Sequence, residues 1–271
     1  MDEKLKRVLK EKYNPEGSNR REGQLRMLEM LIFFDAFCDK HGLRYWLDGG
    51  TILGAIRHGG FIPWDDDLDV DMPYQDCQKL ESLIGRNKIG NYVLQTHKTD
   101  KGYFRFWPVL RDTKSLYVHE DNIYTEQTLN FKGCQIDIFP VVPKYNSFIM
   151  KVNMFTKKVV NYIWEKESKN GVLFLTKLVF FFAKYIIYPI LRVLSRSKSE
   201  HLTFDFGIGF INEDRMYSEI FPLSEVIFEG HKFKAPHNPL AYCKRIYGEN
   251  CMGMPSGEMI YNHHVNIKFF E

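Results

Sequence analysis

Several features that would assign this chain to a class at once are missing from its sequence. The five cysteines are odd in number and include no C-x-x-C pair, which argues against a disulfide framework and against a zinc knuckle. We therefore expect reduced, mostly buried thiols. The formal net charge of +3 is too small for a general nucleic-acid-binding surface, so no nucleic-acid partner is predicted.

Long apolar runs are also missing. The first residues, MDEKLKRVLKEKY, contain no apolar stretch, so no secretory signal peptide is visible. The most apolar region, Phe148–Leu194, is interrupted by Lys177, Lys184 and Pro189, whereas a transmembrane helix needs ~20 uninterrupted apolar residues. We expect a cytoplasmic protein, with the inner face of the cell membrane as a further candidate location.

What the chain does have is the composition of a folded protein. Hydrophobic residues make up 44% and charged residues 26% of the sequence, which excludes wholesale disorder and a multi-span membrane protein. Its 271 residues fit one large domain, or a core with one sizeable insertion.

Apolar periodicity predicts alternating helices and strands. Residues at helical spacing predict a helix over Arg20–His41 that stops at Gly42, and a second helix over Thr51–His58 that stops at Gly59. Pro73 is expected to open a further helix at its first position. Strands are predicted over Arg44–Leu47, Asp67–Met72, Tyr92–Thr96, Arg105–Arg111 and Cys134–Val142. The predicted fold class is α/β (α+β), with a mixed sheet flanked by helices.

Residues 144–198 differ in charge from the rest of the chain. They contain 11 Lys or Arg against two Glu, a net charge of +9 that leaves −6 for all other residues. Because this region is apolar as well as basic, it fits either a helical hairpin lying on an anionic membrane or a buried helix pair covering the sheet. The predicted division is a core with its N-terminal helix at 1–143, a helical, basic and apolar insertion at 144–200, and a C-terminal part at 201–271.

A run of acids stands between Trp64 and Pro73. Five of the seven residues from Asp65 to Asp71 are aspartates, and together they repel unless a cation lies among them. A solvated loop would not explain the alternation with Leu68 and Val70, and a charge cluster at a helix start would need few of these acids. An EF-hand loop fails because its required Gly falls on Val70. Oxygen ligands favour Mg²⁺ or Mn²⁺.

The surroundings of the acidic run are typical of phosphate chemistry. Gly49-Gly50 follows a strand and precedes a helix, where backbone N–H groups and the helix dipole can face phosphate oxygens. Asp137 is a lone acid in the apolar strand Cys134–Val142, where an unpaired charge is costly. Asp67, Asp69 and Asp137 therefore predict metal-dependent phosphoryl transfer, with a salt-bridged core acid as the alternative for Asp137.

The text DGGTILGAIRHGGFIPWDDDLDV resembles the LicD family, bacterial phosphocholine transferases related to the fukutin-type ribitol-phosphate transferases, with a nucleotidyltransferase fold. The resemblance is close over Leu43–Met72, weaker over Arg105–Phe139, and extends to Pro239–Pro255 through Tyr242, Tyr247-Gly248 and Met254. Phe148–Leu194 is expected to carry none of it.

The resemblance implies roles for particular residues. Asp67 and Asp69 match the metal-binding pair, Asp137 the third catalytic acid, and Asp65 a further metal-binding position. Substrate-binding roles are expected for the turn Gly49, Gly50 and Thr51, for Arg57 and His58, and for Arg105 and Arg111 as phosphate clamps. The alternatives are a surface helix end for His58 and surface ion pairs for Arg105 and Arg111.

The family also implies a reaction. A hydroxyl of a cell-surface glycan, such as lipopolysaccharide, teichoic acid, capsule or a lipid-linked precursor, would attack the distal phosphorus of CDP-choline or a similar CDP-linked donor. Phosphocholine or a related phospho-alcohol would be transferred and CMP released. The alternatives are a nucleotidyltransferase acting on a small molecule or sugar, and an inactive membrane-associated scaffold. Peripheral contact with an anionic membrane is a further expectation.

Overall fold

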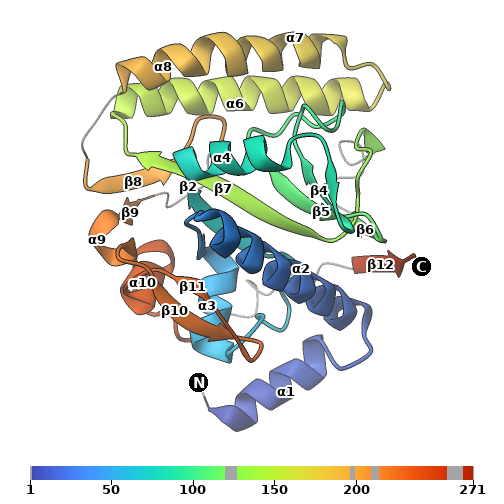
Figure 1. Ribbon diagram of the computed structural model, residues 1–271, viewed down its shortest axis with the longest axis vertical. Coiled ribbons are helices and arrows are strands. Elements are labelled where there is room, and N and C mark those ends of the chain that lie inside the picture. Colours follow the sequence, from blue (N-terminus) through green and yellow to red (C-terminus); the bar gives the residue numbers. More distant parts are fainter. Residues whose placement is uncertain (1, 120–126, 196–198, 209–213, 255–264, 271) are drawn as a thin grey trace.

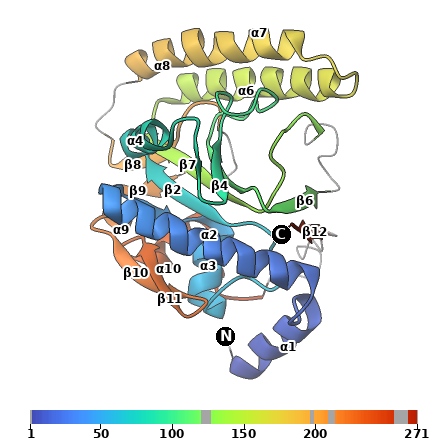
Figure 2. The ribbon, with the colours of Figure 1, turned by 45° about the vertical axis from the view of Figure 1, so that its right-hand side comes forward.

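The computed structural model describes residues 2–119, 127–195, 199–208, 214–254 and 265–270. A mixed sheet forms its centre, and the helices pack on the faces and at the ends of that sheet (Figure 1). The view in Figure 2, turned by 45°, keeps the α6–α8 hairpin at one end of the molecule and α1 at the other. The mixed α/β class predicted from the sequence is confirmed.

The longest helix is α2, and its ends follow from the sequence. The Ser18 side chain accepts a hydrogen bond from the Arg21 backbone at the start, and Gly42 closes the helix with φ of 61°, as predicted. The helices are α1 (Glu3–Tyr13), α2 (Asn19–His41), α3 (Gly49–His58), α4 (Tyr74–Ile84), α6 (Ser147–Ser168), α7 (Phe174–Phe182), the π-helix η2 (Ala183–Ile187), α8 (Tyr188–Leu194), α9 (Tyr217–Ile220) and α10 (Pro239–Tyr247).

The main sheet runs in the order β1-β2-β7-β5-β4-β3, and β8 and β9 extend it beside β7. Its strands are β1 (Trp46–Leu47), β2 (Asp69–Pro73), β3 (Lys88–Ile89), β4 (Tyr92–Gln95), β5 (Val109–Asp112), β7 (Gln135–Pro143), β8 (His201–Phe204) and β9 (Arg215–Met216). Two separate pairs are formed by β10 (Ser224–Phe228) with β11 (His231–Ala235), and by β6 (Ser115–His119) with β12 (Val265–Phe269).

Strand β7 organises the sheet because it pairs with three others. It lies parallel to β2, with Asp137 opposite Asp69, and antiparallel to β5. Its far end pairs with β8, Val141 opposite Phe204. The α6–α8 hairpin is therefore inserted between two neighbouring strands of one sheet, and the C-terminal part returns to that sheet.

Some predicted boundaries are shifted. Helix α3 begins at Gly49, so the glycine pair is the first turn of the helix instead of a loop before it. Pro73 ends β2 and is the N-cap residue of α4, so this helix begins at Tyr74, one residue later than predicted. The strand predicted over Arg105–Arg111 is β5, which begins only at Val109. The five cysteines are free and buried, as expected.

The hairpin has one covered and one uncovered side. On the covered side, a core cluster buries residues of α7, η2 and α8 together with residues of α6 and of the segment before β5. The buried residues of α7, η2 and α8 are Phe180, Ala183, Tyr188 and Leu191. The apolar run that was predicted to fall short of a transmembrane span, because Lys177, Lys184 and Pro189 interrupt it, forms one continuous helix of α7, η2 and α8 over Phe174–Leu194. By length and composition this helix could cross a membrane, and only 28% of its most apolar stretch is buried. A fully buried helix pair is therefore excluded.

Candidate active site

The start of α3 lies against two carboxylates. A Cβ atom on Gly49 would stand 3.0 Å from Oδ2 of Asp69, and one on Gly50 would collide with Oδ2 of Asp65. Gly49 also has φ of 54°, in the left-handed region that favours glycine. The two glycines thus let the N-terminal turn of α3 approach the acidic run as closely as the backbone allows.

The acids predicted as catalytic gather at this turn. Asp69 begins β2 and stands opposite Asp137 across the parallel pair β2–β7, so both side chains lie on one face of the sheet. Asp65 and Asp67 precede the strand. The strand predicted over Asp67–Met72 is β2, which starts two residues later, so Asp67 lies outside the strand.

The electrostatics of these carboxylates are those of a site with excess negative charge. Burial, and then the charge of Asp137, hold the pKa of Asp69 well above its usual range. Repulsion by Asp65, followed by burial, does the same for the pKa of Asp67. Burial raises the pKa of Asp65 to about 6. Each shift means that a negative charge at that position lacks compensation.

Neutral groups, and no cations, hold these acids in place. Asp137 accepts hydrogen bonds of 2.6 Å from Trp107 Nε1 and 2.6 Å from Gln135 Nε2. The Asp69 backbone donates to Thr51 Oγ1 over 2.9 Å, so the Thr51 hydroxyl fixes the start of β2. Across the described ranges, no Lys, Arg or His forms an ion pair with Asp65, Asp67, Asp69 or Asp137. The salt-bridged alternative for Asp137 is thus not seen.

A second group of acids lies behind the first and is partly compensated by one arginine. Arg215 donates from Nη2 to Asp48 and from Nε to Asp71, both over 2.7 Å, and its guanidinium lies 3.9 Å above the ring of Phe204. The buried Tyr242 hydroxyl donates to Asp48. Asp71, one of the five acids of the run, is therefore ion-paired in the interior, although burial still raises its pKa, whereas Asp65, Asp67 and Asp69 have no ion-pair partner among the described residues.

Within the described part of the chain, the two residues at the end of α3 form no hydrogen bond or ion pair with the four acids, although the charge of Arg57 acts on Asp65. Arg57 is buried and donates from Nη1 to the backbone oxygens of Cys251 and Gly253, each over 3.2 Å. His58 packs edge-on against Trp64 and borders a cavity beside α1. Burial lowers the pKa of His58 to about 4, so the ring is neutral at pH 7. For both residues the structure favours a role in packing, against the predicted contact with substrate.

The two predicted phosphate clamps separate. Arg111 is 0% exposed and donates from Nε to Gln95 and from Nη1 to the Gly133 carbonyl, so these partners hold it in the interior, and a phosphate contact for Arg111 stays a prediction. Arg105 remains partly exposed and lies 5.8 Å above the ring of Trp107, which is the residue that donates a hydrogen bond to Asp137.

Sequence reasoning missed several residues of the site. Trp107 and Gln135 orient Asp137. For Gln135 the available signal was its position two residues before Asp137 on one strand face, whereas Trp107 lies 30 residues from Asp137 and gave no such signal. The Tyr247 hydroxyl would stand 3.7 Å from a Gly49 Cβ, so Tyr247 lies beside the glycine turn. Burial and the charges of Asp48, Asp69 and Asp65 raise its pKa.

This arrangement is shared with known proteins. The family model described as LicD/FKTN/FKRP, nucleotidyltransferase domain, matches residues 42–180, just over half of the chain. The chain belongs to the LicD family. The match reaches residue 180, which corrects the expectation that Phe148–Leu194 carries no resemblance. It ends before Pro239–Pro255, where the resemblance stays a prediction, and Pro255 lies outside the described residues.

Individual relatives match this LicD-family chain over short stretches. The lipopolysaccharide cholinephosphotransferase LicD of Haemophilus influenzae is 43% identical over 76 residues, which cover 28% of this chain and 29% of that protein. The ribitol 5-phosphate transferase FKRP of Homo sapiens is 52% identical over 44 residues, 16% of this chain and 9% of FKRP. Mannosyltransferase regulator 4 of Saccharomyces cerevisiae is 32% identical over 72 residues, 27% of this chain and 6% of that protein. The matches thus span less than a third of each relative.

Proposed function

We propose that this chain is a metal-dependent phosphotransferase that moves phosphocholine, or a related phospho-alcohol, from a CDP-linked donor to a hydroxyl of a cell-surface glycan or its lipid-linked precursor. The observation that carries the proposal is a set of four acids without an ion-pair partner among the described residues. Asp65 and Asp69 lie against the glycine start of α3, Asp137 stands opposite Asp69, and Asp67 is repelled by Asp65. Family membership and the names of the two transferases among the relatives support the class of reaction.

The donor set fits a hard divalent cation. Asp65, Asp67, Asp69 and Asp137 offer only carboxylate oxygens and have no cationic partner among the described residues, which suits Mg²⁺ or Mn²⁺. When bound, the cation would neutralise charge on the departing phosphate. Within the described ranges no three such side chains are already arranged as ligands, so loading requires the carboxylates to move together.

The chain's own groups would do the remaining work. The N-terminal turn of α3 would bind donor phosphate oxygens, since Gly49 and Gly50 place no side chain between its N–H groups and the acids. Asp137, oriented by Trp107, would accept the proton of the attacking hydroxyl. The acceptor oxygen would form a bond to the distal phosphorus while the bond to the CMP phosphate oxygen breaks, and CMP would leave.

The expected products distinguish this reaction from its alternatives. The full chain with Mg²⁺, CDP-choline and a saccharide acceptor should give free CMP and a saccharide heavier by one phosphocholine, and EDTA should abolish both. Mass spectrometry of a single reaction measures the two products. CMP attached to the acceptor, with free phosphocholine, would replace the proposal by nucleotidyl transfer. Absence of products and of CMP release with CDP-choline, CDP-ribitol and CDP-glycerol would leave the inactive scaffold.

We further propose that the enzyme works at the cytoplasmic face of a membrane, held by the α6–α8 hairpin. Apolar side chains on the uncovered side of α7–α8 are exposed, among them Leu178 at 59%, Phe182 at 52% and Ile190 at 54%. Residues 144–198 carry a net charge of +9. Exposed apolar residues next to many cations suit an anionic bilayer surface. The buried side of the same helix favours a helix that lies on the membrane over one that spans it.

Membrane binding should depend on the uncovered side of this helix. The wild-type chain should sediment with phosphatidylcholine vesicles that contain phosphatidylglycerol, and Phe182→Glu should weaken this binding about tenfold or more, because a buried Phe side chain contributes ~1.5–3 kcal/mol. Ile227→Glu, at an equally exposed position of β10, should change little. Recovery of the wild type in the supernatant with these vesicles would contradict the proposal.

A further inference from the structure

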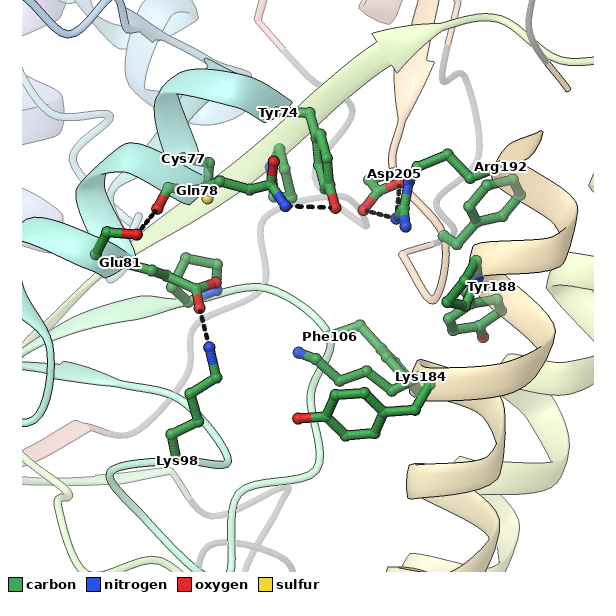
Figure 3. A pocket seen from close by; sticks show the side chains of 16 residues that line it. Tyr74, Cys77, Gln78, Glu81, Lys98, Phe106, Lys184, Tyr188, Arg192 and Asp205 are labelled. Carbon is green, nitrogen blue, oxygen red and sulfur yellow. Dashed lines mark hydrogen bonds and ion pairs between the residues drawn. The ribbon is translucent and has the colours of Figure 1, made fainter.

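A cavity of about 380 Å³ lies between α4 and the continuous helix α7–η2–α8, apart from the acids of the active site (Figure 3). Phe106, Pro108 and Pro140 form part of its wall. The residue between the first two, Trp107, is the one that donates to Asp137. One short segment of the chain therefore borders both the cavity and the candidate catalytic acid.

The charges around the cavity do not balance. Lys98 pairs with Glu81 over 3.3 Å, and Arg192 makes a bidentate pair with Asp205 over 2.7 and 2.8 Å. Lys184 is the remaining charged residue of the lining, and within the described ranges its amine makes no hydrogen bond or ion pair. The lining thus carries one positive charge in excess.

The Lys184 amine faces the cavity. It extends from η2 across the space toward α4, on the side where Lys98 meets Glu81 (Figure 3). Lysines at a membrane surface usually direct their amines outward to the headgroups along the exposed side of a helix. Lys184 is partly buried and faces inward, although the next residue, Tyr185, is 53% exposed. Burial lowers its pKa, so an unpaired charge here costs stability unless an anion lies nearby.

Polar groups without partners accompany this lysine. The hydroxyl of Tyr188 belongs to a side chain only 2% exposed, and it has no hydrogen-bond partner among the described residues. The same is true of Arg192 Nε. Both residues line the cavity. Both atoms are enclosed by protein, so they do not face a ligand in the cavity, and the amine of Lys184 would carry the recognition of an anion (Figure 3).

We propose that this cavity binds a phosphate ester of single negative charge through Lys184. Such an anion would balance the excess charge, and its oxygens would accept hydrogen bonds from the Lys184 amine. A soluble phosphate ester and a phospholipid headgroup share this chemistry. The lipid is the occupant the position favours, since the outer side of the same helix is exposed and apolar, and this part of the inference rests on the proposed membrane contact.

Calorimetric titration of the full chain tests the site. The probes are inorganic phosphate and dihexanoyl-phosphatidylglycerol below its micelle-forming concentration. Both should bind, the short-chain lipid more tightly. Lys184→Met should weaken both at least about tenfold, the effect of losing one hydrogen bond from a charged donor. Lys177→Met, which removes an exposed lysine from the same helix, should leave both affinities within twofold of the wild type, a difference of ~0.4 kcal/mol in binding free energy.

A change of opposite sign provides a second control. Glu81→Gln releases Lys98 from its partner, so it should tighten the binding of both probes. Equal affinities for the wild type and a folded Lys184→Met variant, or no binding of either probe, would overturn the site. Equal affinities of the wild type for the two probes would overturn the lipid as occupant and assign a soluble phosphate ester. Asp69→Asn should bind both probes normally, so failure of the transfer reaction stays distinguishable from failure of this site.

Discussion

Asp69→Asn should lower the rate of phosphoalcohol transfer by about a thousandfold while the protein stays folded. Asn keeps the size of the side chain and removes the charge that would hold the metal opposite Asp137. Loss of several kcal/mol of charge stabilisation in the transition state corresponds to about three orders of magnitude in rate. The measurement is CMP release from CDP-choline at saturating Mg²⁺, with Glu225→Gln, an exposed acid of β10, as the control.

The same variant should be more stable than the wild type when metal is removed. The pKa of Asp69 is raised by burial and by Asp137, so the folded state favours the protonated form. Stability from this group is present below the pKa of an unfolded aspartate and is lost as pH rises through the raised folded value. In EDTA, the thermal midpoint of the wild type should therefore fall from pH 5 to pH 8 more steeply than that of Asp69→Asn.

Two results would contradict this assignment. Activity of Asp69→Asn within about tenfold of the wild type, a difference of ~1.4 kcal/mol in the barrier, would exclude Asp69 as a metal ligand. A thermal midpoint that falls equally with pH in both proteins would show that the Asp69 charge is compensated in the folded chain. Recovery of wild-type stability on adding Mg²⁺ or Mn²⁺ at pH 8, absent in the variant, would support the metal site directly.

Local patterns in the sequence were enough to predict the centre of the active site. Alternation placed Asp69 on a strand with one buried face, and the isolated acid Asp137 marked a second strand. The parallel register that sets the two acids opposite each other joins residues far apart in the chain and has no local signal. The glycine pair was predicted to face phosphate oxygens; the structure places it inside the first turn of α3, next to Asp65 and Asp69.

Long-range pairing explains what could not be predicted. Asp71 has the same local pattern as Asp69, yet Arg215, 144 residues away along the chain, forms an ion pair with it. Arg111 is held in the interior because Gln95 and Gly133, from other parts of the chain, accept its hydrogen bonds. Nothing in the residues next to Asp71 or Arg111 distinguishes a structural charge from a functional one.

Pro189 illustrates a different limit. A proline lacks an N–H donor and its ring crowds the preceding turn, and Pro189 was counted among the residues that interrupt the apolar run. The structure places it at the beginning of α8, directly after the π-helical turn η2, and the helix continues. The wider π turn is a known way to absorb such a local mismatch. It also places Lys184 within η2, where its amine faces the cavity.

Arg215→Met should destabilise the fold more than any other change considered above, by about 3–5 kcal/mol. Met retains much of the apolar stem, but Asp48 and Asp71 would then be buried, at 4% and 0% exposed, without their cation. For a domain of this size ~1 kcal/mol shifts the thermal midpoint by roughly 2–4 °C, so a fall of about 10 °C is expected. Differential scanning calorimetry at pH 7 measures it.

Two further variants separate lost charge balance from lost packing at Arg215. Arg245→Met breaks a more exposed pair with Glu219 and should cost less than about 1 kcal/mol. Adding Asp71→Asn to Arg215→Met should recover part of the stability, because it removes one of the two carboxylates left unpaired. If the double variant were less stable than Arg215→Met, the guanidinium would act mainly through its packing on Phe204. Asp48 and Asp71 would then not depend on the charge of Arg215. The ion pair would no longer explain why these two aspartates differ from the acids of the active site.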